Sequence, residues 1–527
     1  MGKGVVKLGE GKWATKDGKL LAAKETNRRF KNAEFTVARG TRATYVGRDG
    51  LIKESNLQDV NLVTNGTFDA DSDWTKGTGW SINGGVASCN GTSGATIHQN
   101  ISGVQNNIYA IIVTVSNYTS GTLQIGGSSN NLEVNANGTY THYRTWTSDG
   151  NLYFKSKSGD GFTGSIDNVS VKEVKTDTPR IDFTDNTDGH LLLEPQSTNL
   201  ITYSEELSAE SNVTLSNTIS PDGTLSGLKI NETTSNSQHY SGSYHASVVD
   251  DGTIYTVSFY VKKGTYDTVK AYTGSNRISA QLNITFSTES TSLSGSSSVS
   301  GSNFMEDAGN GWYRVGFSAT AHTTGAVLIY LSPKDLTTYV GDISQYTEYW
   351  GIQLEALSYP TSYIPTNGST VTRDAETCTG SGEAIDFNSS EGVLYAEIAA
   401  LADDGTFRSI SLSNGTATNR VSIRYNTTSN SISAFVYQGT TTVLSYNNIV
   451  SDVKDFHKVA IKYKSGDVSF WVDGVEVATS SSSFLFLTLT DLSFIRGDND
   501  RFFYGKCKAI RVYKEALSDS ELTTLTS

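Results

Sequence analysis

Six aromatic residues lie in contexts that could place a ring on the surface beside hydrogen-bonding side chains. An exposed Tyr or Trp ring can stack on the apolar face of a pyranose sugar, because the contact buries apolar area on both partners. Asn, Asp and Gln side chains beside the ring can exchange hydrogen bonds with the sugar hydroxyls. The sequence therefore predicts sugar binding in three separate stretches of the chain. The candidate residues are Tyr143, Trp146, Tyr240, Tyr244, Tyr425 and Tyr437.

Short β-strands must position these rings. Apolar residues recur at every second position in many short runs, such as 255–261, and clusters of Gly, Asn, Asp and Ser separate the runs. This pattern is typical of antiparallel strands with one face in a core, and many such strands in series indicate all-β sandwiches. The Asp-Gly pair at 49–50 predicts a hairpin turn. Five tryptophans are expected in the cores: Trp74, Trp80, Trp312, Trp350 and Trp471.

Length and charge limit the domain organisation and the partners. A chain of 527 residues exceeds what one hydrophobic core supports, so three or four domains are expected. Residues 1–54 contain 13 Lys and Arg against 6 Asp and Glu, a formal charge of +7, whereas the rest of the chain carries −20. The acidic body disfavours nucleic acid, because polyphosphates bind to basic faces. The basic segment is expected to dock on an acidic protein surface, with a nucleic-acid contact as the alternative.

The sequence lacks the common catalytic and metal-binding motifs. It has no Gly-x-Ser-x-Gly, phosphate-loop, His-Glu-x-x-His or Cys-x-x-Cys pattern. His239 and His245 could share one side of a strand and bind a metal, but polar surface residues are the favoured interpretation. Glycoside hydrolysis needs two carboxylates across a cleft, and 54 Asp and Glu leave that possibility open. Neither a secretory signal nor a membrane-spanning apolar run is visible, so neither is expected.

The stretch 59–176 carries the first family resemblance. It opens with NLVTNGTFD at 61–69, closes with GSIDNVSV at 164–171 and has GWS at 79–81 between them. In these segments it resembles the jelly-roll carbohydrate-binding modules that accompany glycanases. The resemblance implies a structural calcium ion, held by an acidic residue after the opening motif and another in the closing strand. The matching residues are Asp69 and Asp167, with two solvated carboxylates as the alternative.

A second resemblance covers the flanking segments. The sequences FTVAR at 35–39, LLLEPQSTNL at 191–200, GWYRV at 311–315 and YPTSYIPT at 359–366 resemble a recurrent phage structural module. Such modules occur in tail-fibre and other virion appendage proteins. In that family the strand with Gly-Leu-Ile, here at 50–52, leads almost directly into the strand with Leu-Leu-Leu-Glu-Pro, whereas here 59–176 intervenes. We expect this stretch to be an insertion into a surface loop, which loop-closure entropy tolerates.

The C-terminal stretch 375–527 carries a third resemblance. Alternating runs at 457–463 and 468–472 are joined by SGD at 465–467, and the chain later reads AIRVYKEALSD at 509–519. These features resemble the laminin-G/concanavalin-like lectin fold, which implies a β-sandwich. A helical turn is expected at Asp519–Leu525.

These observations predict an all-β chain with three antiparallel β-sandwich (jelly-roll) domains in series after an N-terminal anchoring arm. The expected parts are a basic arm with a virion-anchoring hairpin (1–58), an inserted jelly roll (59–176), a second jelly roll of phage structural type (177–374) and a lectin-like sandwich (375–527).

The resemblances imply a structural protein of the bacteriophage virion, a tail fibre or tail appendage, that attaches to host-surface glycans without catalysis. One alternative is a capsid decoration or head-fibre protein. An accessory glycan-degrading enzyme is the alternative from another class. The expected partners are other virion proteins through residues 1–54, host polysaccharide and further copies of the chain. Nucleic acid and membrane insertion are not expected, and calcium is the one cofactor considered.

The calcium prediction can be tested on residues 58–176 alone. Because calcium would bind the folded state and not the unfolded one, it should raise the melting temperature relative to a chelator. The stabilisation would be about 2.7 kcal/mol at a free calcium concentration of about 100 times Kd. Differential scanning calorimetry measures this shift. Superimposable melting curves with calcium and with chelator would contradict a shared ion at Asp69 and Asp167.

Overall fold

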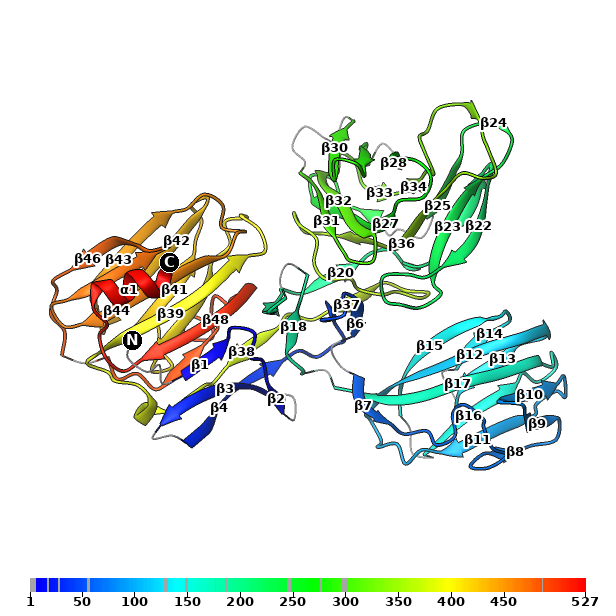
Figure 1. Ribbon diagram of the computed structural model, residues 1–527, viewed down its shortest axis with the longest axis horizontal. Helices are drawn as coiled ribbons and strands as arrows, with labels where there is room; N and C mark the ends of the chain where they lie inside the picture. Colours follow the sequence, from blue (N-terminus) through cyan, green and yellow to red (C-terminus); the bar gives the residue numbers. More distant parts are fainter. Residues whose placement is uncertain are drawn as a thin grey trace. The chain divides into compact units, whose positions relative to one another are not determined.

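The structure, a computed structural model, is nearly all β (Figure 1). It describes residues 6–16, 19–26, 29–54, 57–127, 131–146, 150–175, 177–184, 187–243, 248–274, 277–295, 302–485 and 487–527. The paired strands run antiparallel, which confirms the predicted fold class. Within these ranges the helices are one 3-10 turn, Ala384–Asp386, and α1 (Asp519–Thr526), the latter at the predicted helical turn. No described helix has the length and apolar character needed to cross a membrane.

The chain forms two compact units, one of which interrupts the other in sequence. Residues 56–176 form one unit, and residues 1–55 together with 177–527 form the other. The smaller unit is inserted between β6 (Ile52–Glu54) and β18 (Arg180–Asp182). The predicted stretch 59–176 is therefore an insertion in the chain.

The inserted unit is a two-sheet sandwich, here called the first sandwich. One sheet has the order β15 (Gly138–Thr145), β12 (Ile108–Ser120), β17 (Thr163–Val174), β10 (Val86–Asn90) and β9 (Trp80–Asn83), with β7 (Leu57–Asn61) also on β17. The other, called the β16 sheet, has the order β14 (Leu132–Val134), β13 (Leu123–Gly126), β16 (Asn151–Ser156), β11 (Thr96–Asn100) and β8 (Thr75–Lys76). Alternate residues, such as Val113 from β12 and Phe154 from β16, form the core. Trp74 and Trp80 lie in this core, as predicted.

The second sandwich also has two sheets. The sheet called the β28 sheet has the order β21 (Ser208–Ser211), β25 (Tyr240–Ser243), β34 (Ile329–Leu331), β28 (Thr268–Thr273), β29 (Gln281–Thr285) and β30 (Ser290–Ser294). The opposite sheet has the order β22 (Val213–Thr218), β23 (Gly227–Glu232), β36 (Tyr346–Glu355), β27 (Ile254–Lys262), β32 (Trp312–Thr320) and β31 (Asn303–Asp307). Trp312 and Trp350 are buried together with Tyr260 and Tyr363, which confirms the prediction for both tryptophans.

The C-terminal sandwich pairs a small sheet with a wide one. The small sheet, called the β40 sheet, has the order β43 (Thr441–Ile449), β42 (Ser431–Gln438), β41 (Asn419–Tyr425), β40 (Arg408–Ser413) and β47 (Asp491–Ser493). The wide sheet has the order β38 (Thr377–Thr379), β4 (Arg29–Ala38), β3 (Lys19–Thr26), β1 (Val6–Gly9), β48 (Gly505–Tyr513), β39 (Glu391–Ala400), β44 (His457–Lys464), β45 (Val468–Val472) and β46 (Val475–Ser480). In addition, β19 (His190–Leu193) pairs with β48.

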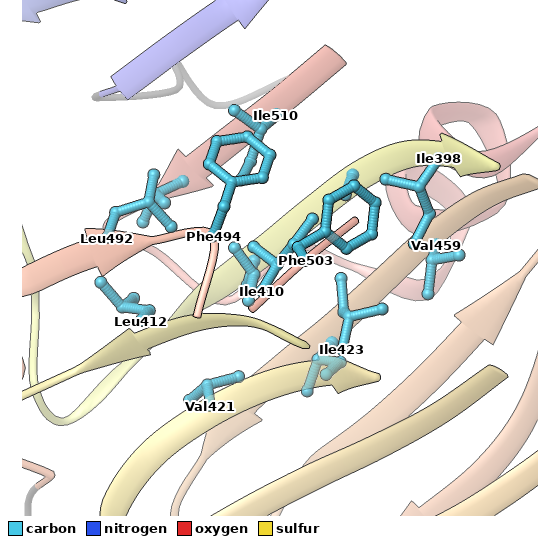
Figure 2. Packing of buried hydrophobic residues seen from close by; sticks show 14 of the residues in the cluster. Ile398, Ile410, Leu412, Val421, Ile423, Val459, Leu492, Phe494, Phe503 and Ile510 are labelled. Atoms are coloured by element: carbon cyan, nitrogen blue, oxygen red, sulfur yellow. The ribbon is translucent and has the colours of Figure 1, made fainter. Parts of the chain in front are cut away.

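Side chains from the two sheets fill the core between them (Figure 2). Ile410 and Ile423 from the β40 sheet share this core with Ile398 and Ile510 from the wide sheet. The helix α1 packs on the wide sheet, where Leu522 lies in one cluster with Trp471. Trp471 is buried, as predicted.

The N-terminal strands correct one prediction. Residues 1–58 were expected to form an arm outside the sandwiches, but β1 pairs with β48 from Val6↔Val512 to Gly9↔Ala509 (Figure 1, blue beside red). β3 pairs with both β1 and β4, and β4 pairs with β38. Because Phe35 and Leu20 are fully buried in the C-terminal core, this segment gains its order from its own chain. The predicted hairpin is present, with β5 (Thr44–Val46) paired to β6.

A cluster of buried charges, here called the hub, joins segments far apart in the sequence. Its members are Arg39, Arg180, Glu194, Arg373 and Glu376, and each of their side chains is at most 3% exposed. Arg39 follows β4, and Glu376 precedes β38, which pairs with β4. The hub therefore fixes where the chain enters and leaves the second sandwich.

The hub carboxylates are satisfied on every side. Glu194 pairs with Arg180 at 2.7 Å and with Arg373 at 2.8 Å, and it accepts hydrogen bonds from the backbone N–H (2.7 Å) and hydroxyl (2.6 Å) of Ser362. Glu376 pairs with Arg39 and Arg180 and accepts a 3.0 Å bond from the backbone N–H of Glu194. Burying charges is stabilising only when partners replace water in this way.

The electrostatic balance of the hub favours charged carboxylates. Burial acts to raise the pKa of Glu194, but the guanidinium groups of Arg373 and Arg180 outweigh it and lower the pKa to about 2. The pKa of Glu376 is lowered for the same reason by Arg180 and Arg39, against the effect of burial. Burial and the neighbouring arginines lower the pKa of Arg39 to about 10, against the attraction of Glu376. At neutral pH all three groups are therefore ionised.

One prediction concerns the N-terminal strands. The Phe35→Ala substitution should destabilise the C-terminal sandwich by about 3–5 kcal/mol, because it leaves a cavity in that core. Thr36→Ala removes an exposed side chain on the same strand and should change stability by less than about 0.5 kcal/mol. Urea unfolding of the full chain measures both. Equal stabilities of the two variants would mean that this segment forms no part of the core.

Acid should unfold the larger unit through the hub. Because the pKa of Glu194 is lower in the folded state, its contribution to stability is complete above the unfolded-state pKa of about 4.5. That contribution, on the order of 3 kcal/mol, should be lost as the pH falls from about 4.5 to about 2. The Glu194→Gln variant should be less stable at pH 7 and should lose less stability over that pH range. Parallel pH profiles for the two proteins, measured by urea unfolding, would contradict this account.

Candidate sugar-binding faces

Two of the six candidate aromatic residues are buried, which corrects the prediction of an exposed ring at each. Trp146 is 1% exposed and packs edge-on against Tyr109, with 5.3 Å between the ring centroids. Tyr425 is 4% exposed and stacks on Phe503 at 6.1 Å. Tyr425 has the same strand parity as Val421 and Ile423, and all three side chains enter the core. Neither ring can stack on a sugar.

Three further candidates reach the surface in part. Tyr143 on β15, Tyr240 on β25 and Tyr437 on β42 are half-buried. The sixth candidate, Tyr244, lies outside the described residues. Further aromatic rings lie next to Tyr240 and Tyr437.

Tyr240 belongs to an aromatic cluster on the outer face of the β28 sheet. Its ring meets the ring of Tyr330 edge-on at 5.0 Å, and Tyr330 stacks on Tyr272 at 6.0 Å with 14° between the ring planes. Tyr272 and Tyr330 are register partners on neighbouring strands, and Tyr272 is also paired with Gln281. Cross-strand pairing thus builds a row of rings that ends in an amide.

Alternation explains why these rings face outward. Val269 and Ala271 on β28 and Leu282 on β29 enter the core, so Tyr272 and Gln281 must point to the other side of the sheet. Gly274 makes room for the cluster, because a Cβ there would lie 1.9 Å from the ring of Tyr330. The sequence analysis identified Tyr240 and missed the other two rings.

The β16 sheet carries a smaller aromatic pair. His98 on β11 and Tyr153 on β16 are register partners, and their rings stack at 4.9 Å with 30° between the planes. The side-chain amide of Asn151 donates a 3.3 Å hydrogen bond to the hydroxyl of Tyr153. This face of the first sandwich therefore offers a stacking surface at residues that the sequence analysis did not select.

On the outer face of the β40 sheet, arginines lie over aromatic rings. The Cζ atom of Arg420 is 4.5 Å from the ring centroid of Tyr437, its cross-strand partner. The Cζ atom of Arg424 is 4.0 Å from the ring centroid of Phe435 and 4.9 Å from that of Phe407. Such guanidinium–ring contacts are attractive.

A further arginine reaches this face from the segment after β47. The Cζ atom of Arg501 is 4.4 Å from the ring centroid of Phe407. Arg496, in the same segment, is neutralised by Asp498, at 2.5 Å, and by Asp500, at 2.9 Å. We call Arg420, Arg424 and Arg501, with the rings beneath them, the arginine face.

Burial and the neighbouring positive charges lower the pKa values of two arginines on this face. Burial, followed by the charges of Arg501 and Arg420, lowers the pKa of Arg424 to about 10. The pKa of Arg420 is also lowered, first by burial and further by Arg496 and Arg501. Both guanidinium groups stay charged at neutral pH. An anion close to them would stabilise their charged form.

The predicted metal ligands make local hydrogen bonds. Asp69 accepts a 2.6 Å bond from the hydroxyl of Thr67, and Asp167 accepts a 2.6 Å bond from the backbone N–H of Asn168. Across the described part of the chain, no three His, Cys, Asp or Glu side chains are grouped so as to hold a metal ion. Calcium binding by Asp69 and Asp167 stays a prediction.

The histidine pair is only partly described. His239 is buried, and its ring nitrogens lie 2.7 Å from the carbonyl oxygen of Asn212 and 3.1 Å from that of Ser235. It is therefore a core residue and not the polar surface residue that the sequence analysis favoured. His245 lies outside the described residues.

Three solved structures illustrate what the chain is similar to. One is the CBM40 domain of Ruminococcus gnavus IT-sialidase bound to α2,3-sialyllactose, with 14% identity over 28% of this chain and 94% of that chain and a TM-score of 0.24. Another is the CBM22-1–CBM22-2 tandem of Paenibacillus barcinonensis Xyn10C, with 12% identity over 57% and 99% and a TM-score of 0.19. The third is domains LG4-5 of the mouse laminin α1 chain, with 11% identity over 55% and 88% and a TM-score of 0.19.

The sequence itself matches one family model. No curated protein matches the sequence. Residues 383–523 match the model described as the concanavalin A-like lectin/glucanases superfamily. This match covers the strands of the β40 sheet and most of the C-terminal sandwich. It confirms the predicted concanavalin-like lectin domain at the C-terminus.

Proposed function

We propose that this protein is a structural component of a bacteriophage virion, a tail fibre or tail appendage, that binds glycans on the host surface without cleaving them. The observation that carries the proposal is the repeated placement of aromatic rings on an outer sheet face. Such rings lie on the β16, β28 and β40 sheets, one in each sandwich. The lectin-like match of residues 383–523 supports the same function for the C-terminal sandwich.

The groups beside the rings favour binding over catalysis. On the β28 sheet Gln281 and Asn283 lie on the same face as Tyr272 and can exchange hydrogen bonds with sugar hydroxyls. On the β40 sheet the neighbours are guanidinium groups and serines. Glycoside hydrolysis needs a proton donor and a second carboxylate across the scissile bond. These faces instead present amides, hydroxyls and cations.

The virion role is supported by the segments that resemble the phage module. The segments around Arg39 and Glu194 supply charges to the hub, and Ser362 donates a hydrogen bond to Glu194. Three segments that carry the resemblance thus meet in one buried network of this chain, which supports their belonging to one structural module. Residues 1–54 remain the proposed contact with other virion proteins, since their charge of +7 contrasts with −20 elsewhere. Such docking would weaken with salt.

Binding should be weak for one site and strong for many. A stacked ring contributes about 1 kcal/mol, so one face gives roughly millimolar affinity, near −4 kcal/mol. Repeated copies on one particle would multiply these contacts through effective concentration. An array of bacterial surface glycans, probed with bead-coupled and with monomeric full chain, should give signal chiefly for the bead-coupled protein. Release of reducing ends from a bound polysaccharide would instead establish an enzyme.

The β28 face can be tested by paired substitutions. Tyr272→Ala and Tyr330→Ala should each weaken binding of the array ligand about fivefold, whereas Tyr272→Phe should keep the stacking contact and most of the affinity. Tyr346→Ala on the opposite sheet is the matched control and should leave binding unchanged. Isothermal titration calorimetry with each variant provides the measurement. Equal losses for Tyr346→Ala and Tyr272→Ala would show that the β28 face is not the site.

A further inference from the structure

We propose that the arginine face of the C-terminal sandwich selects anionic glycans, that is, sugars that carry carboxylate or sulfate groups. This inference rests on the proposed glycan-binding function and names the ligand class for one of its faces. The proposal needs three properties of the face: fixed cations, room in their hydrogen-bonding capacity, and rings that can contact the sugar itself.

Strand geometry fixes the cations. Arg420 and Arg424 lie on β41 with Ser422 between them at the same parity, so both side chains leave the sheet on the outer side. Across the sheet Arg424 faces Ser409 on β40 and Ser433 on β42. The rings beneath the guanidinium groups restrict their rotation, which reduces the entropy lost when an anion binds.

Two of the three cations keep unused hydrogen-bonding capacity. Within the described residues neither Arg420 nor Arg424 forms an ion pair with a carboxylate, whereas Arg501 lies 3.7 Å from Asp500. Each hub arginine, by contrast, pairs with Glu194 or Glu376. Arg420 donates one 3.3 Å bond to Ser422. Among the buried polar atoms without a partner in the described structure are the Nε of Arg424 and the hydroxyl oxygen of the fully buried Ser409. Ser409 and Arg424 are register partners on neighbouring strands.

The neighbours of the cations suit a sugar better than a free ion. Phe407 is 36% exposed and lies between the contacts of Arg424 and Arg501, where its ring can meet an apolar sugar face. Asn447 is exposed and accepts a 3.2 Å hydrogen bond from the buried Asn426, so its own amide nitrogen can donate to a sugar hydroxyl. Burial, and then the charges of Arg501 and Arg420, lower the pKa of Arg424, and a bound anion would offset the repulsion among these cations.

The contrast with the β28 face supports the assignment. On that face the neighbours of the three tyrosines are the amides Gln281 and Asn283. Lys270, the register partner of Asn283, supplies a cation on β28. A net charge of −13 on the whole chain would otherwise repel polyanions, so local cations are needed to hold them. The two faces are therefore expected to bind different sugars.

The test compares matched polysaccharides on the full chain. Dextran sulfate is compared with dextran of the same length, and polygalacturonate with its methyl ester. Biolayer interferometry should show binding of at least one charged member of each comparison, with little binding of its neutral partner. Raising NaCl from about 50 mM to about 500 mM should weaken that binding, because salt screens the contact. The affinities for dextran sulfate and for polygalacturonate then show whether the face prefers sulfate or carboxylate.

Substitutions assign the binding to this face. Each of the substitutions Arg424→Gln, Arg420→Gln and Arg501→Gln should weaken binding of the charged probe at least about tenfold. This is the loss expected when a charge-assisted hydrogen bond is removed. Arg501 is outside the strands, so its variant tests the face even if the strand variants fold poorly. Lys464→Gln, on β44 of the other sheet, also removes one positive charge. It should change the affinity by less than about threefold, because an exposed charge contributes little.

Two outcomes would overturn the inference. One is equal affinity for charged and neutral polysaccharides, or no binding of either charged probe. The other is a loss for Lys464→Gln as large as that for Arg424→Gln, which would indicate attraction to overall charge. Failure of the proposed function is distinguishable, because it would also remove the array signal that depends on Tyr272 and Tyr330. If that signal persists while the arginine variants have no effect, the function stands and this inference falls.

Discussion

The hub of buried charges constrains how segments far apart in the sequence of the larger unit meet. Arg180 contacts both hub carboxylates, so the strand β18 that follows the inserted sandwich is tied to segments on either side of the second sandwich. Each hub charge has lost its water, and removing one partner would leave another buried and unpaired. Such a network tolerates little change in its members. It can tolerate a long insertion between β6 and β18, because the loop lies outside it.

The same principle of charge satisfaction separates the hub from the arginine face. In the hub, three guanidinium groups meet two carboxylates and several backbone and hydroxyl groups, and the charges are completed within the chain. On the arginine face, three guanidinium groups lie over aromatic rings, and of these Arg501 also lies 3.7 Å from the carboxylate of Asp500. A ring attracts a cation without neutralising it. One cluster is therefore complete as a structural element, whereas the other retains capacity for an external anion.

Three sandwiches with aromatic faces offer a physical basis for adhesion through many weak contacts. A sheet face is shallow, so it buries part of a sugar and cannot enclose it, which limits the affinity of a single contact. Several faces on one chain and several chains on one particle compensate for this limit. The rings differ between faces: a His–Tyr pair at His98, three tyrosines around Tyr330, and arginine-covered rings around Phe435. Adhesion of this kind would respond to the composition of a surface and not to one sugar alone.

Local features of the sequence were enough to predict the fold class, through period-two alternation, and the hairpin at 49–50, through its Asp-Gly pair. The five tryptophans expected in the cores are also buried. Alternation along the strand also predicts that Tyr425 is buried, because Tyr425 is two residues from Ile423 and four from Val421, which both enter the core. Only the tertiary structure decided which strands are neighbours. Backbone pairing is nearly independent of side chains, so nothing local joins β1 to β48, or Tyr272 to Tyr330. The aromatic cluster, the arginine face and the place of the N-terminal strands therefore exist only once distant segments have paired.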